Sequence, residues 1–68
     1  MYDLWVSDEN GFNLVSRHWS LSDGKAKARE IVEGRGWAVR ACLCVGRGRH
    51  MMTLWSVRGG AWPFGTEV

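Results

Sequence analysis

One segment of helical period stands between two pairs of segments of strand period, and this order constrains the fold more than any other feature of the chain. Residues 2–7 and 12–19 alternate between apolar and polar side chains, which is typical of half-buried strands. Asn10-Gly11 lies between them and favours a tight turn. The first two strands are therefore predicted to form a hairpin, with Phe12 and Leu14 on one side of the second strand.

Residues 22–33 are predicted to form the single helix. Ser20 can cap its first turn, and Asp23 places a negative charge where the helix dipole favours one. Glycine at position 34 or 36 is expected to end the helix, and Gly24 weakens it by about 1 kcal/mol relative to alanine. The apolar residues at helical spacing share one face: Leu21, Ala28, Ile31 and Val32.

Two more strands are predicted, over residues 37–45 and 51–57, with a glycine-rich turn between them. The order β-β-α-β-β predicts an α+β fold, a four-stranded antiparallel sheet with one helix on one face. A chain of 68 residues has room for one domain, spanning 1–68, with residues 60–68 as a possible extended C-terminal tail. The helix is expected to pack on these sheet residues: Leu4, Leu14, Val39, Leu43 and Leu54.

Several classes of protein do not fit the chain. Apolar runs such as residues 41–46 are far too short to cross a bilayer, and Asp3 stands where a signal peptide carries basic residues. We therefore expect a protein of the host-cell cytoplasm with no membrane partner. Cys42 and Cys44 would share a strand face but supply only two of the four ligands of a structural zinc. Reduced thiols that fill space are expected, with no metal and no cofactor.

No catalytic arrangement stands out in the sequence. Serine, histidine and aspartate occur in almost any soluble chain, and none here has the local context of a nucleophile. His18 is interpreted as a surface or interface histidine. Gly46-x-Gly48 lacks the third glycine and the following helix of a dinucleotide site. The prediction is that the protein is not an enzyme and has no catalytic residues.

Charge and aromatic residues point instead to a binding surface. Six of the seven acidic residues precede Gly34, and every charged residue between there and Thr66 is an arginine. Tryptophan and arginine are the residues enriched at binding hot spots. Strand alternation places Trp5, Trp19 and Arg40 on the sheet face opposite the helix, with Trp55 as a further candidate. The predicted partner-binding residues are these four and two of the basic turn: Trp5, Trp19, Arg40, Arg47, Arg49 and Trp55.

Alternatives remain for each part of this surface. The tryptophans can be core residues of a protein too small to bury them fully, or residues 62–64 can fold back over them. The Arg47/Arg49 turn can be a solvated hairpin end. If the face is open, it can serve a protein partner, a homodimer or single-stranded nucleic acid, whose bases stack on aromatic rings.

The layout resembles that of small phage-encoded anti-CRISPR inhibitors of type I systems. The resemblance rests on Ser20-Leu21-Ser22, Ala26-Lys27, Ile31, the strand at 37–45 and Trp55, although the lysine-rich surface of some such inhibitors is largely missing. It implies a protein that occupies a surface of a nucleic-acid-handling complex. We expect a small phage or mobile-element protein that inhibits or regulates such a host complex by direct protein contact, or alternatively a nucleic-acid-binding module using the Trp/Arg sheet face.

Overall fold

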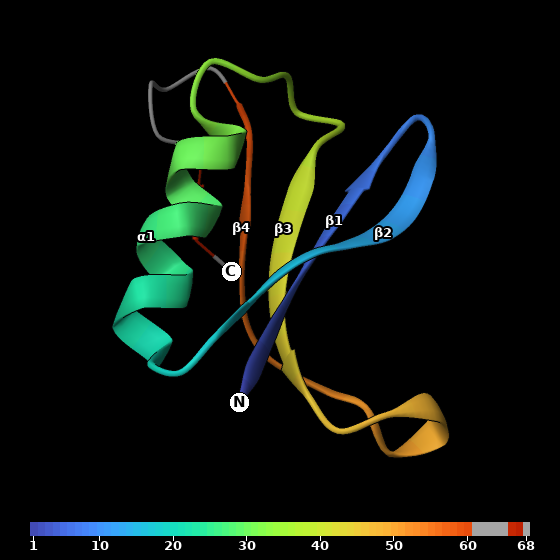
Figure 1. Ribbon diagram of the computed structural model, residues 1–68. Helices are drawn as coiled ribbons and strands as arrows, with labels where there is room; N and C mark the ends of the chain where they lie inside the picture. Colours follow the sequence, from blue (N-terminus) through green and yellow to red (C-terminus); the bar gives the residue numbers. More distant parts are fainter. Residues whose placement is uncertain (61–65, 68) are drawn as a thin grey trace.

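A computed structural model describes residues 1–60 and 66–67 of the chain. Its elements are β1 (Tyr2–Asp8), β2 (Gly11–His18), α1 (Leu21–Val32), β3 (Arg40–Val45), the 3-10 turn η1 (Gly48–His50), β4 (Met52–Arg58) and β5 (Thr66–Glu67). The strands are antiparallel in the order β2-β1-β3-β4-β5, and α1 packs on one face of this sheet (Figure 1). The predicted four-stranded sheet with one helix is confirmed. The two-residue β5 adds a strand within the segment that was predicted as a tail.

The helix forms where the sequence predicts it, one residue earlier at each end. Ser20 Oγ accepts a hydrogen bond of 3.1 Å from the Asp23 amide, and Gly34 follows the helix with a φ of +74°. Gly24 has a packing role that could not be inferred from its low helix propensity. A Cβ at this position would lie 2.7 Å from Leu43 Cδ2. Glycine thus lets the first turns of α1 approach β3 closely.

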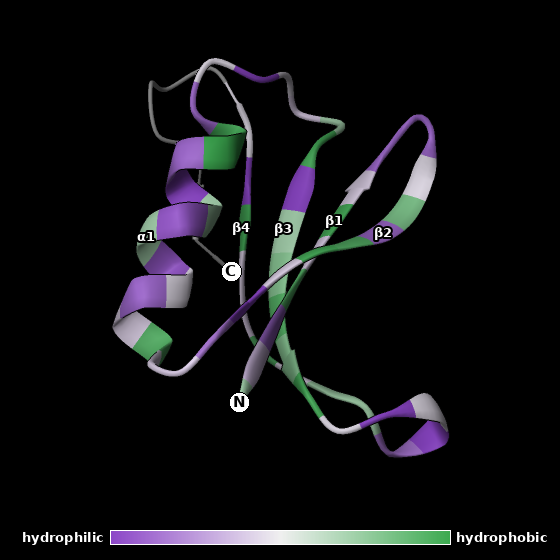
Figure 2. Cartoon of the chain, in the orientation of Figure 1, coloured by the Kyte–Doolittle hydropathy of each residue, from purple (hydrophilic) through white to green (hydrophobic). Residues whose placement is uncertain are grey.

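The core lies between α1 and the sheet. Figure 2 shows green, apolar stretches along β3 and β1, while much of α1 is purple. Leu4 and Leu43 are fully buried at the centre of the core, so the folding of each removes a complete apolar side chain from water. The buried cluster comprises Leu4, Val6, Ala28, Val32, Val39, Ala41, Leu43 and Val57.

Leu14 and Leu54 were expected in this core, and that prediction is wrong. Both are exposed, at 40% and 45% of their surface. The β1–β2 register shifts between Leu4 and Trp5, and the β3–β4 register shifts between Leu43 and Cys44. Each shift inserts one extra residue, which breaks the inside-outside alternation: Leu14 shares a face with Arg17 across the first shift, and Leu54 is itself the extra residue of the second.

The third strand begins at Arg40, three residues later than predicted. Two successive turns occupy the segment after the helix, with hydrogen bonds from Arg35 N to Val32 O and from Val39 N to Gly36 O. Trp37 therefore lies in a loop and is 60% exposed, although it was predicted to be the first residue of the strand at 37–45.

Candidate functional site

The strand register defines the sheet face that is turned away from α1. Directly paired residues of antiparallel strands point to the same side, so each cross-strand row shares one face. Along the strands, rows on the helix side, which carry the core, alternate with rows on the opposite side, and three rows lie on that opposite side. They are Phe12, Ser7, Arg40 and Arg58; Leu14, Trp5, Cys42 and Ser56; and Arg17, Asp3, Cys44 and Thr53. We call these twelve residues the outer face.

Two aromatic rings stack on the outer face. The rings of Trp5 and Phe12 lie 4.8 Å apart between centroids and are tilted by only 5°. They come from neighbouring rows of β1 and β2, where the diagonal spacing is within reach of aromatic side chains. Phe12 remains 48% exposed, so the stacked pair leaves apolar aromatic surface open to solvent.

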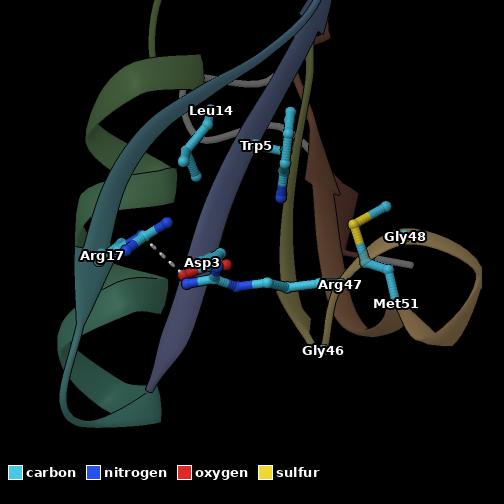
Figure 3. Close-up of a pocket in the computed structure, with 8 residues that line it drawn as sticks. All are labelled: Asp3, Trp5, Leu14, Arg17, Gly46, Arg47, Gly48 and Met51. Atoms are coloured by element: carbon cyan, nitrogen blue, oxygen red, sulfur yellow. Dashed lines mark ion pairs between the residues drawn. The ribbon is translucent and has the colours of Figure 1, made fainter.

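A hollow of about 250 Å³ opens beside this stack. Trp5, Leu14 and Met51 provide its apolar lining, and Figure 3 shows Arg47 extending from the β3–η1 turn toward Asp3. Asp3 Oδ1 lies 3.4 Å from Arg17 Nε in an ion pair at the rim. The complete lining is Asp3, Trp5, Leu14, Arg17, Gly46, Arg47, Gly48 and Met51. Apolar side chains inside and charged side chains around them are the layout of a protein-binding hot spot.

Glycines make the wall formed by the β3–η1 turn possible. Gly46 has a φ of +87°, and a Cβ there would lie 2.5 Å from the His50 carbonyl oxygen. Gly48 has a φ of +58°. Both conformations disfavour other residue types, so these glycines set the path that brings Arg47 and Met51 to the hollow.

Arginines continue along the other end of the outer face. Arg40 and Arg58 are directly paired, and the Arg58 guanidinium lies 5.0 Å from the ring centre of Trp37. Two donors in this area, Trp5 Nε1 and Arg40 Nε, are buried and find no acceptor among the described residues. Because both atoms are shielded from solvent, each unpaired donor costs stability rather than offering a contact at the surface.

The structure brings some of the predicted site residues together and separates others. Trp5 and Arg40 lie on the outer face as predicted, and Arg47 lines the hollow. Arg49 lies in η1, exposed but outside the lining. Trp19 lies in the junction between β2 and α1 and is 84% exposed, more than any other large apolar residue described.

Trp55 does not belong to this surface, and its predicted place on the outer face is wrong. It pairs with Leu43 and packs against the core on the helix side. Lys25 Nζ and the Arg29 guanidinium of α1 lie 5.5 and 5.3 Å from its ring centre. The extra residue at position 54 in β4 reverses the side to which Trp55 points.

The centre of the outer face is also less open than expected. Cys42, Cys44 and Ser56 are buried, and Cys44 Sγ lies 3.6 Å from Thr53 Oγ1. Both thiols are free and share a face, as predicted. Burial, with a smaller contribution from neighbouring Cys44, raises the pKa of the Cys42 thiol. The idea that residues 62–64 cover this face concerns residues outside those described.

A Ser-His-Asp chain does occur, although no local sequence context indicated it. His18 Nε2 lies 2.7 Å from Ser16 Oγ, and His18 Nδ1 lies 2.8 Å from Asp23 Oδ2. The order of atoms matches that of a catalytic triad. Neither the hollow described above nor a second one beside the β1–β2 turn reaches these side chains. The geometry supports a clamp that joins the end of β2 to the first turn of α1.

Sequence reasoning missed several residues of the site. Phe12 and Leu14 were correctly placed on one side of their strand, but Leu14 was assigned to the helix side. Arg17 was missed as a partner of Asp3. Counting residue pairs back from the Asp8–Gly11 pair without a register shift would set Asp3 opposite position 16. Met51 enters the hollow through the path of the turn, for which the sequence offers only glycines as a signal.

Other kinds of site have no support in the described part of the chain. Residues 1–60 and 66–67 hold no group of three or more side chains suited to a metal ion. Among the same residues, no helix has the length and apolar character needed to span a membrane. Comparisons with protein-family models, curated proteins and solved structures found no match. The resemblance to anti-CRISPR inhibitors therefore stays a prediction.

Proposed function

We propose that this protein is a non-enzymatic binding module that inhibits or regulates a host nucleic-acid-handling complex by direct protein contact, as an anti-CRISPR-type phage or mobile-element protein would. The outer face is the contact surface, and the hollow is its anchor point. The proposed site of action is the host cytoplasm. The observation that carries the proposal is the hollow itself, where Trp5, Leu14 and Met51 are surrounded by charged side chains.

The lining indicates the chemistry of the partner segment. A large apolar side chain would fill the hollow and remove the Trp5, Leu14 and Met51 surfaces from water. Arg17 and Arg47 outnumber the single acid Asp3, so a carboxylate next to the apolar anchor is favoured. Arg49 and the exposed Trp19 would extend the contact beyond the hollow. The partner is thus a protein segment that combines an apolar anchor with acidic flanks.

A nucleic-acid-binding module remains the second candidate, because the outer face carries stacked rings and several arginines. Three observations favour protein. The formal net charge is only +2, Asp3 lies at the rim of the hollow, and Leu14 and Met51 offer no contacts to phosphates. Gel shifts with single-stranded DNA and RNA at low and high salt separate the candidates. The account expects no shift at either salt.

The direct test is capture of proteins from a candidate host lysate by matched variants. Wild-type protein is expected to retain a partner that Arg47→Glu and Trp19→Ala release, each weakening binding by more than about 1 kcal/mol, the hot-spot scale. Lys27→Glu on α1 is the control, since it also changes a cation to an acid but lies away from the outer face. Retention that is equal in all variants, or lost only with Lys27→Glu, would contradict the proposal.

A further inference from the structure

The β2 strand ends the sheet on one side and has no neighbour beyond it in the described structure. An unpaired edge offers free backbone donors and acceptors to another strand. Proteins usually protect such edges with lysine, proline or charge, but β2 contains neither lysine nor proline, and Arg17 is its one arginine. Phe12, Leu14 and Val15 are all exposed along it, at 48%, 40% and 48%.

The turn that precedes β2 indicates which backbone groups face the open edge. Asp8 and Gly11 close a two-residue hairpin loop, so they form a hydrogen-bonded pair. From there, non-hydrogen-bonded and hydrogen-bonded pairs alternate along the two strands. Gly11 and Asn13 therefore direct their backbone groups to β1. Phe12 and Leu14 direct theirs outward. The register shift lies beyond Leu14, which leaves residues 11–14 regular.

This outward pattern is complementary to itself in antiparallel orientation. Pairing two copies about Asn13 places Phe12 opposite the partner's Leu14, and Leu14 opposite the partner's Phe12, so each pair can exchange two backbone hydrogen bonds. Both side chains lie on the outer face, where the aromatic ring would pack on the aliphatic one beside Trp5. The same pairing brings the exposed Glu9 of one copy to the Arg17 end of the other.

We propose that a second copy of this chain binds along the β2 edge, with the twofold axis at Asn13, so that the two sheets become one continuous sheet. The interface is isologous, since each copy contributes the same strand. It differs from a dimer made by packing two outer faces together. It rests on the β2 edge and not on the proposed function, although two of its residues, Leu14 and Arg17, also line the hollow.

Sedimentation velocity with charge variants at the axis tests this inference. The wild type is expected to approach twice its 7.7 kDa mass as concentration rises. Asn13 is exposed, so Asn13→Lys and Asn13→Asp should both fold, while each sets two like charges opposite each other. Each variant alone is expected to dissociate at least about tenfold more readily. An equimolar mixture of the two should regain the doubled mass, because Lys then faces Asp.

Met52→Lys is the matched control, since it adds the same charge to an exposed strand residue away from β2 and should dimerise like the wild type. Hydrogen exchange gives a second readout, in which the Phe12 and Leu14 amides become protected as the dimer forms. A wild type that stays monomeric at all concentrations would overturn the inference. So would a dimer that tolerates both Asn13 variants, or a mixture of them that remains monomeric.

Discussion

Replacing Trp55 by alanine tests whether this ring packs between the helix and the sheet or belongs to a binding surface. The ring packs against the core and lies under two cations of α1, at 5.5 Å from Lys25 Nζ and 5.3 Å from the Arg29 guanidinium. Truncating a buried tryptophan costs about 3 to 5 kcal/mol, and the lower end applies because Trp55 is only partly buried. Its indole N–H has no acceptor among the described residues, so no hydrogen bond is lost. We expect a cost of about 3 kcal/mol.

Thermal unfolding followed by circular dichroism measures this cost. For a domain of this size, 1 kcal/mol corresponds to roughly 4 to 8 °C, so Trp55→Ala should lower Tm by at least about 12 °C. Trp19→Ala is the matched control. Trp19 is 84% exposed, so its removal should change stability by no more than about 0.5 kcal/mol. A normal Tm for Trp55→Ala, or early unfolding of Trp19→Ala, would refute the assignment of these two rings.

Three further outcomes follow from the core, the thiols and the Ser-His-Asp chain. Leu43→Ala should cost about 2 to 5 kcal/mol, which in so small a domain can prevent folding, and normal urea unfolding would show the packing to be wrong. Because burial raises the pKa of Cys42, iodoacetamide should modify it slowly at pH 8 in native protein and quickly after denaturation; equal rates would contradict its burial. A fluorophosphonate probe should leave Ser16 unlabelled, and labelling that His18→Ala abolishes would reveal a catalytic serine instead.

The number, order and type of the main elements could be predicted from periodicity and capping residues. Ser20 and Gly34 mark the ends of α1, and the alternation around Leu4 and Leu43 places both side chains in the core. Alternation along a single strand misplaced Leu14 and Trp55, although counting pairs from the Asn10-Gly11 turn sets Leu14 opposite Trp5. Each lies next to a one-residue register shift, which depends on strand pairing rather than on the local pattern.

The candidate site was predicted only in part, for a related reason. Trp5 and Arg40 lie on regular stretches of strand, so counting placed them correctly. The hollow requires a turn that is distant in sequence to bring Arg47 and Met51 beside β1. Local patterns do not encode such long-range approaches. The glycines at positions 46 and 48 indicated a turn there, but not the direction in which it folds.

Hydroxyl-radical footprinting of the protein with and without its captured partner tests the central claim most directly. Met51 lines the hollow, whereas the equally oxidisable Trp37 lies in the loop between α1 and β3. Both are exposed in the free protein, so both should react. The account predicts that the partner protects Met51 at least severalfold and leaves Trp37 much less affected. Protection of Trp37 or of α1 with Met51 still fully oxidised would contradict the claim that the hollow is the binding site.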